Sequence, residues 1–341
     1  MRTVFRRRCM RKQWRDYLQE GKGKMSKTHN MVGMKQASPK FFGLFADMRR
    51  NYDLYLMALP GVVFYILFKY WPMWGVQIAF RDFSPITGVV GSEWVGLEWF
   101  QRFFSSYQFE SLLLNTFLIS VYTLAVGFPI PILLALMLNS CVNTTFKKTV
   151  QMVTYAPHFI STVVMVAMLN VFFGQSFGFV NNIREMLGAE RVLYMGLPQY
   201  FRHMYVWSDV WQSMGWNAII YISALSGVSQ ELHEAARVEG ASKLQRIIHI
   251  DIPHILPTAT ILLIMNSGNL LSVGFDKVYL LQNAQNLRHS QVISTYVYEI
   301  GILKNQYSYS SAIGLFNSII SFALLFAVNK ISQHVGETSL W

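Results

Sequence analysis

The chain has 341 residues, of which 52% are hydrophobic, 15% are aromatic and only 14% are charged. An ordinary soluble domain carries about 25% charged residues, and here the apolar residues gather into blocks without Asp, Glu, Lys or Arg. This composition argues against a soluble enzyme and for an integral membrane protein. The two cysteines, Cys9 and Cys141, have no metal-binding spacing and offer no disulfide framework.

Most of the formal net charge of +11 lies in the N-terminal segment, residues 1–53, which holds 14 Lys or Arg and 4 Asp or Glu. A basic tail before the first apolar segment is the usual sign that this end of a membrane protein stays in the cytoplasm. No nucleic-acid-binding motif accompanies the charge, so no nucleic acid is expected as a partner. We therefore predict a basic cytoplasmic tail over residues 1–53.

Six apolar segments have about the 20 residues that an α-helix needs to cross the hydrocarbon core. In chain order they lie within residues 54–79, 112–138, 150–173, 205–225, 255–275 and 310–328. Lys69 and Pro72 fall inside the first segment, where Pro72 is expected to kink the helix. The short loop after the second segment holds Lys147 and Lys148, which places it in the cytoplasm. Six crossings put both termini inside, with a cytoplasmic C-terminal tail over residues 331–341.

An aromatic-rich segment, residues 94–104, follows the first span on the outer side. Aromatic rings at this density beside a span are typical of an interfacial helix at the level of the lipid headgroups. The alternative is a docking surface for a partner on the outside.

The loop between the fourth and fifth spans, residues 229–257, is cytoplasmic on this topology. Its first part predicts a short helix in which Leu232, Ala235 and Ala236 share one face. Gly240 is expected to end that helix, because glycine adopts a positive φ without strain. The loop therefore begins with a short amphipathic helix that stops at a sharp turn.

A second helix in this loop is predicted to start at Ser242, which forms a capping-box pattern with Gln245. Pro253 and Pro257 are expected to end it and to lead into the fifth span. An exposed apolar face normally needs a partner, so the two helices are a candidate docking element at the inner membrane surface. The alternative is an ordinary amphipathic loop with a glycine turn.

The spacing of seven loop residues resembles the EAA loop of binding-protein-dependent ABC importer permeases. The matching residues are Glu234, Ala235, Ala236, Gly240, Ile250, Ile252 and Pro253. Ile252 stands where the family has Leu, a change that keeps size and polarity. The resemblance implies that residues 229–253 couple the chain to an ATP-hydrolysing subunit, with Glu234 pairing with a partner cation or capping a partner helix.

Other segments are similar to the oligo- and polysaccharide subgroup of these permeases, and only the first fifty residues fall outside the resemblance. They are residues 59–61, 69–70, 72–73, 79–80, 82–83 and 94–97 near the start, and residues 274–279, 293–298 and 336–341 near the end.

The resemblance implies an all-α integral membrane protein with the ABC type I importer permease fold, six transmembrane helices and a permease domain over residues 54–330. It implies a bacterial inner-membrane location and four kinds of partner: a second, non-identical permease, two ATPase subunits, an extracytoplasmic solute-binding protein and the lipid bilayer. The partner ATPases would use ATP-Mg, and this chain would bind no cofactor. The implied substrate is an oligosaccharide moved by alternating access, and a uronic-acid-containing sugar is one option.

Polar residues at membrane depth are costly and tend to face the bundle interior or a watery cavity. The residues predicted on this basis to line a substrate path are Asn115, Gln212, Asn217, Asn266 and Asn269, with Tyr122, Tyr155, Trp211 and Trp216 as aromatic faces for sugar rings. Asn170 is at similar depth, and His158 is expected to bond backbone carbonyls freed by Pro157. The alternative for each residue is hydrogen bonding between helices.

Two rival functions stay open at this level. One is an amino-acid or peptide importer permease of the same fold. The other is a self-sufficient carrier or a membrane enzyme, which needs an acid or a catalytic pair inside the membrane. Asp209 is the lone acid within a predicted span and lies near its outer end. The sequence shows no phosphate-binding Gly-rich loop and no metal-ligand motif, so neither an active site nor a metal site is predicted.

Overall fold

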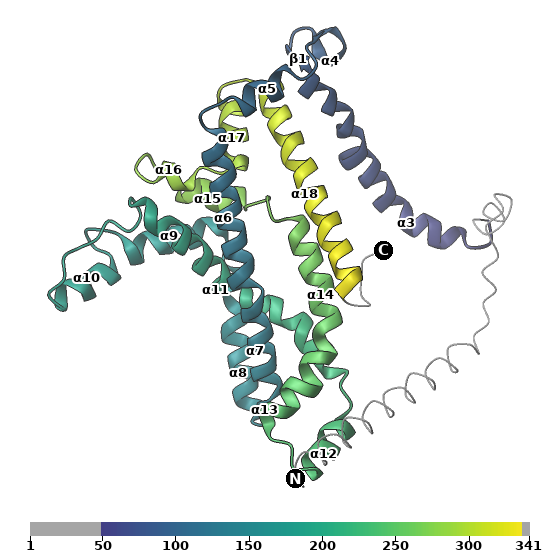
Figure 1. Ribbon diagram of the computed structural model, residues 1–341, viewed down its shortest axis with the longest axis vertical. Helices are drawn as coiled ribbons and strands as arrows, with labels where there is room; N and C mark the ends of the chain where they lie inside the picture. Colours follow the sequence, from purple (N-terminus) through teal and green to yellow (C-terminus); the bar gives the residue numbers. More distant parts are fainter. Residues whose placement is uncertain (1–48, 336–341) are drawn as a thin grey trace, which may run out of the picture. The chain divides into compact units, whose positions relative to one another are not determined.

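The computed structural model describes residues 49–335 of the chain (Figure 1). The described chain divides into two units, which meet between Pro72 and Met73 and are treated separately here. Nearly all of the predicted N-terminal tail and the last six residues of the predicted C-terminal tail lie outside the described residues, so both tails stay predictions.

The first unit is a helix in the first predicted span. Helix α3 covers Tyr52–Tyr65 and continues as a π-helical turn, η1, over Ile66–Tyr70. The 3-10 helix η2, Trp71–Phe80, follows at the position of Pro72, whose ring and missing N–H oppose a regular α-helix. No residue of α3 is buried.

Short elements begin the second unit. Strand β1 (Arg81–Asp82) pairs antiparallel with β2 (Glu93–Trp94), with Arg81 opposite Trp94. Helix α4 (Gly88–Gly91) lies between the strands, and α5 (Glu98–Phe104) follows them. The aromatic segment predicted to lie at the interface is partly internal: Phe103 is 1% exposed and its ring lies 5.5 Å from that of Phe316 in α18.

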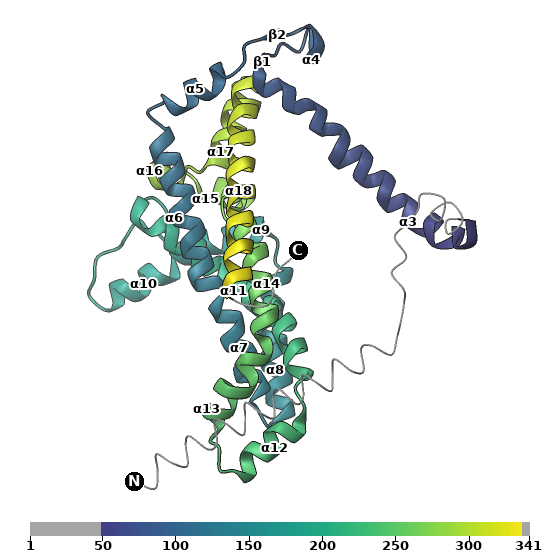
Figure 2. The same ribbon diagram turned by 45° about the vertical axis from the view of Figure 1, so that its right-hand side comes forward.

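The long helices of the second unit pack in two groups (Figures 1 and 2). Helices α6 (Phe109–Gly127) and α7 (Pro129–Asn139) follow one another with Pro129 at the start of α7, and both pack on α11 (Pro198–Ser226). Helix α14 (Ile252–Gly268) packs on α18 (Tyr307–Val335) and on α11. Buried apolar side chains of α6, α9 and α11, including Ile119, Val166 and Val206, form the largest core cluster.

The third predicted span, residues 150–173, is sharply bent in the structure. Helix α8 (Thr144–Tyr155) and the 3-10 turn η3 (Ala156–Phe159) meet α9 (Thr162–Phe173) at a bend of 102°. Pro157 starts the break, because proline cannot donate a helical hydrogen bond. Ser161 then caps α9, with its hydroxyl accepting from the Val164 N–H at 3.4 Å.

The predicted end of the loop's second helix is wrong. Helix α13 (Lys243–Arg246), the π-helical turn η4 (Ile247–Asp251) and α14 form one helix from Lys243 to Gly268. Pro253 lies in the first turn of α14, where its missing N–H falls just after the widened turn and interrupts no regular α-helical bond. At its other end, α14 stops at Gly268, seven residues before the predicted end of the fifth span at residue 275.

Within residues 49–335, four helices are long and apolar enough to cross a membrane, or five if the bent pair is one span. They are Tyr52–Phe80, Phe109–Asn139, Lys243–Gly268 and Tyr307–His334. Helix α11 covers the fourth predicted span but is not among these four, because its many polar residues, such as Asp209, Gln212 and Asn217, lower its mean hydropathy. The predicted helical membrane fold is confirmed, apart from the short β1–β2 pair, while the count of six spans and the side of each terminus stay predictions.

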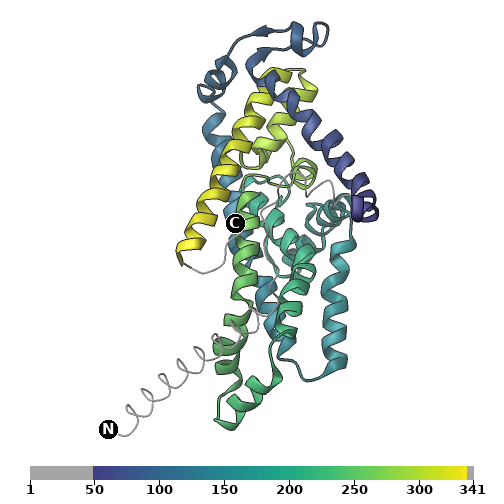
Figure 3. The same cartoon turned by 90° about the vertical axis from the view of Figure 1, so that its right-hand side faces the viewer.

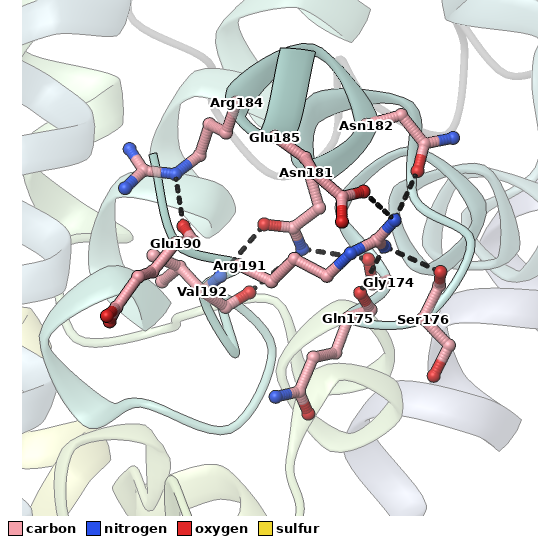
Figure 4. Close-up of polar contacts among 10 residues, drawn as sticks. All are labelled: Gly174, Gln175, Ser176, Asn181, Asn182, Arg184, Glu185, Glu190, Arg191 and Val192. Atoms are coloured by element: carbon pink, nitrogen blue, oxygen red, sulfur yellow. Dashed lines mark hydrogen bonds and ion pairs between the residues drawn. The ribbon is translucent and has the colours of Figure 1, made fainter. Parts of the chain in front are cut away.

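Polar side chains close a loop that leaves the bundle between α9 and α11 and contains α10 (Phe179–Met186) (Figure 4). Asn181 is fully buried; its amide donates to the carbonyls of Gly174 and Val192, both at 2.9 Å, and accepts from the Val192 N–H at 2.9 Å. Arg191 donates to the carbonyl of Ser176 and pairs with Glu185, both at 2.6 Å. These contacts hold the two ends of the loop together.

The chain between α14 and α18 folds into four short helical elements. They are α15 (Phe275–Leu281), α16 (Leu287–Ser290), α17 (Ile293–Tyr298) and the π-helical turn η5 (Glu299–Leu303). Helix α15 packs on α9 and α11, and α17 packs on α18. Through α15 and α16, this segment packs against α11.

Candidate functional site

The first candidate site is the loop that joins α11 to α14, formed by α12 (Gln230–Val238), α13 and η4. It projects at the ends of α7 and α8 (Figures 2 and 3). Gly240 has φ +81°, the Gly240 N–H donates to Arg237 O at 3.0 Å, and the Ala241 N–H donates to Ala236 O at 2.8 Å. These two bonds form a Schellman motif, which ends α12 in the way the glycine predicted.

The second helix of the loop starts at the predicted capping box. The Ser242 hydroxyl accepts from the Gln245 N–H at 3.3 Å, and the Gln245 side chain accepts from the Ser242 N–H at 2.7 Å. α13, η4 and α14 form one helix from Lys243 to Gly268, so the second half of the loop continues directly into α14. The loop is thus a bent arm of two helices, and its bend at Gly240 is set by the positive φ of that residue.

Exposure divides the predicted coupling residues into two sets. Glu234, Ala235 and Gly240 are exposed, whereas Ala236 is only 8% exposed and packs within the chain. The other predicted coupling residues lie on η4 and α14, where Ile250 is half-buried and Ile252 and Pro253 are exposed. A partner could therefore reach Glu234 and Ala235 on α12, while Ala236 fixes α12 to its own chain.

Sequence reasoning missed a contact that ties the two halves of the loop together. The Nε2 atom of His233 in α12 lies 3.2 Å from Oδ1 of Asp251, a carboxylate that is 3% exposed, in η4. Beside this pair lies a cavity of about 490 Å³ whose wall includes Arg237, Lys243 and Arg246. The signal in the sequence was weak, because His233 and Asp251 are eighteen positions apart on separate helices.

The second candidate site is a polar cavity of about 340 Å³ between α6, α11, α14 and residues 270–274. Its polar lining consists of Ser120, Thr123, Tyr205, Asp209, Ser213, Asn217, Asn266, Asn269 and Ser272. Cavities that bind small molecules measure about 300–1,000 Å³ and carry a few convergent polar groups. The buried hydroxyl oxygens of Ser120 and Thr123 have no hydrogen-bond partner within residues 49–335.

Three of the nine predicted path residues line this cavity: Asn217 from α11, and Asn266 and Asn269 from the end of α14. All three are exposed, so their amide groups are accessible to a ligand. Their roles stay predictions, but the structure brings them together from two different spans.

Two other predicted path residues make hydrogen bonds between helices and chain segments instead. Asn115 is buried; it donates to the carbonyls of Arg288 and Gln291 at 2.9 and 3.1 Å, and it accepts from Arg202 at 2.9 Å. Gln212 donates to Ile160 O at 2.6 Å, which satisfies a carbonyl at the bend before α9. These arrangements match the alternative of structural hydrogen bonding.

The four aromatic candidates do not line the polar cavity. The Tyr122 hydroxyl lies 3.0 Å from His203 Nδ1, and Trp211 lines a separate, mostly apolar cavity of about 490 Å³. The ring of Trp216 stacks on His158 at 4.4 Å, a contact that the sequence did not suggest for His158. Tyr155 is half-buried at the end of α8.

The structure adds an ion pair to the wall of the polar cavity. Lys277 Nζ lies 3.3 Å from Asp209 Oδ1, and the Lys277 side chain is 6% exposed. Asp209 was noticed in the sequence as an acid within a span, but Lys277 lies sixty-eight positions away in α15 and outside every predicted span. Within residues 49–335, no group of three or more His, Cys, Asp or Glu could hold a metal ion.

Known proteins match both the chain and its fold. The family described as "Binding-protein-dependent transport system inner membrane component" matches residues 127–336, a range that contains the whole α11–α14 loop. The polygalacturonan/rhamnogalacturonan transport system permease protein YteP of Bacillus subtilis (strain 168) is 41% identical over 288 residues, which cover 84% of this chain and 90% of that protein.

Two crystal structures extend the match. A chain of a bacterial ABC transporter involved in the import of the acidic polysaccharide alginate is 36% identical with a TM-score of 0.79, and the match covers 86% of this chain and 99% of that chain. A chain of a bacterial alginate ABC transporter in complex with an alginate pentasaccharide-bound periplasmic protein is 35% identical with a TM-score of 0.80, covering 87% and 99%. The matched proteins are transport subunits and not enzymes. The chain therefore belongs to the family of binding-protein-dependent transport system inner membrane components and is a transmembrane permease subunit of an ABC importer.

Proposed function

We propose that this permease carries oligosaccharides, with uronic-acid-containing fragments among them, into the bacterial cytoplasm through the inner membrane. It works by alternating access together with a second, non-identical permease, two ATPase subunits that use ATP-Mg and an extracytoplasmic solute-binding protein. The observation that carries the mechanism is the continuous helix from Lys243 to Gly268, which joins the exposed loop directly to the wall of the polar cavity.

The mechanical step follows from this continuity. A partner that grips α12 at Glu234 and Ala235 moves a bent arm whose halves are fixed by the Gly240 turn and by the His233–Asp251 contact. The arm continues as α14, whose end presents Asn266 and Asn269 to the polar cavity. Closure of two ATPase subunits on each other would then change the shape of the cavity, with no chemistry required of this chain.

The nature of the cargo is supported by the cavity and by the relatives. The cavity offers hydroxyl and amide groups, which suit the many donors and acceptors of a sugar. The relative YteP is named for polygalacturonan and rhamnogalacturonan transport, and the matched crystal structures concern alginate. All of these are polysaccharides, and alginate is described as acidic, which favours sugars over peptides as the cargo.

The test is the ATPase activity of the assembled complex in lipid nanodiscs with an excess of its binding protein. Oligogalacturonates and neutral oligosaccharides are expected to stimulate hydrolysis, whereas peptides and amino acids are not. Stimulation by peptides alone would favour the same-fold peptide importer and would refute the sugar assignment. Uptake by this chain reconstituted without any ATPase would instead support a self-sufficient carrier.

A further inference from the structure

We propose, building on the sugar-import function above, that Lys277 enables the polar cavity to accept carboxylated sugars by neutralising the charge of Asp209. Lys277 thereby acts as a specificity-determining residue that lies behind the cavity wall rather than in it.

Asp209 places a negative charge on the wall of the polar cavity, and the positive charge of Lys277 lies just behind that wall. Asp209 lines the cavity, and its side chain is 37% exposed, whereas the Lys277 side chain is 6% exposed. The two charged groups are 3.3 Å apart. The Lys277 ammonium also lies 5.6 Å from the centre of the Tyr205 ring, which itself lines the cavity. The ammonium is thus held between a carboxylate and an aromatic face.

Charge on the wall matters because little else there can offset it. Among the fifteen residues that line the cavity, all within the described part of the chain, Asp209 is the only charged one. If a sugar carboxylate lies about 7 Å from the Asp209 carboxylate, at an effective dielectric constant of about 20, the repulsion lowers the binding constant of the sugar by roughly 50-fold. Water in the cavity reduces this effect to about 10-fold. Without Lys277, a bare Asp209 would therefore exclude a uronate by about one order of magnitude.

The pair also leaves the cavity able to read sugar hydroxyls. Asn217, Asn266 and Asn269 offer amide groups, and the hydroxyls of Ser120 and Thr123 have no partner within residues 49–335. Neutral groups of this kind bind charged and uncharged sugars alike. The ion pair adds tolerance for a carboxylate, because Lys277 offsets the negative charge of Asp209 from behind the wall.

The alternative is that Lys277 merely holds α15 against α11. The two roles predict different patterns. If the ion pair only holds the helices together, removing either partner has the same effect. If the charge of the cavity wall matters, removing Lys277 and removing Asp209 have opposite effects. Lys277→Met leaves a net negative wall, Asp209→Asn leaves a net positive one, and the double variant is neutral. Lys277→Arg keeps the charge and serves as a control for folding.

The experiment measures uptake of a short oligogalacturonate, and of the same sugar with its carboxyl groups methyl-esterified, into proteoliposomes that hold the complete transporter and its binding protein. Relative to wild type, we expect Lys277→Met to lower uptake of the charged sugar about 10-fold and of the ester less than 2-fold. Asp209→Asn is expected to retain or raise uptake of the charged sugar, and the double variant to restore it to within about 3-fold of wild type.

If both single variants lose uptake of both sugars, and the double variant does not recover it, the ion pair has only a structural role and the proposal is overturned. If wild type imports only the neutral ester, the proposal fails while sugar import stands. If wild type imports neither sugar but its ATPases respond to peptides, the proposed function itself fails.

Discussion

The bend of the coupling loop can be perturbed at a single backbone position. Gly240 has φ +81°, and a Cβ added there would meet no atom within 4 Å, so a substitution costs only backbone strain. A left-handed conformation costs an L-residue roughly 1–2 kcal/mol. The Gly240→Ala variant should therefore lower the equilibrium constant for the bent loop by about 5- to 30-fold, and Gly240→Val by more, because a β-branched side chain is stiffer.

Uptake and sugar-stimulated ATP hydrolysis by the reconstituted complex give the readout, and membrane insertion should be normal in each variant. Gly188 provides the matched control, because it also has positive φ (+76°), open space for a Cβ and the same pair of bonds after α10. Gly240→Asn should retain more activity than Gly240→Val, since Asn tolerates the left-handed region. Normal uptake by Gly240→Val, or equal losses in Gly188→Val, would refute the idea that this bend transmits movement.

Three further changes test other parts of the chain. Glu234→Lys reverses an exposed charge on α12 and should lower sugar-stimulated ATPase activity several-fold, while Glu231→Lys on the same helix should not; equal effects would count against a specific partner contact. Asp251→Asn removes the buried charge that holds α12 to η4 and should lower the local stability of the loop by about 1–3 kcal/mol. Trypsin should then cleave the loop faster, and an unchanged cleavage rate would contradict this role. Asn181→Ala deletes three hydrogen bonds of the α10 loop and should lower the melting temperature, whereas Met186→Ala, at an 87% exposed position of α10, should have little effect; equal melting temperatures would disprove the role of Asn181 in holding the loop ends together.

Local chemistry explains which parts of the site could be predicted. The turn at Gly240 and the capping box of Ser242 and Gln245 depend on residues within a few positions of each other, and both form as predicted. The end of the second loop helix could not be predicted in the same way. A proline usually stops a helix, but the widened turn η4 accommodates Pro253 and lets the helix continue into α14.

The polar cavity shows the limit of reasoning from composition. Depth in the membrane marked Asn115 and Asn217 equally, yet one bonds to backbone carbonyls of residues near 290 and the other faces the cavity. Which direction a polar side chain takes depends on the neighbouring helix, and no periodicity in a single span encodes that neighbour. The Asp209–Lys277 pair is of the same kind, because its members come from separate elements.

The amino-acid sequence by itself determined that the chain is a helical membrane protein and where its coupling loop bends. Hydrophobic length and backbone chemistry are local properties, and they act before any two helices meet. Only the tertiary structure decided that α8 and α9 meet at a bend of 102°, that the second helix of the loop runs unbroken into α14, and that the buried Lys277 lies 3.3 Å from Asp209 on the cavity wall. These features depend on packing between segments far apart in the chain, where the free energy of burying a charge or breaking a helix is set by the partner that is found there.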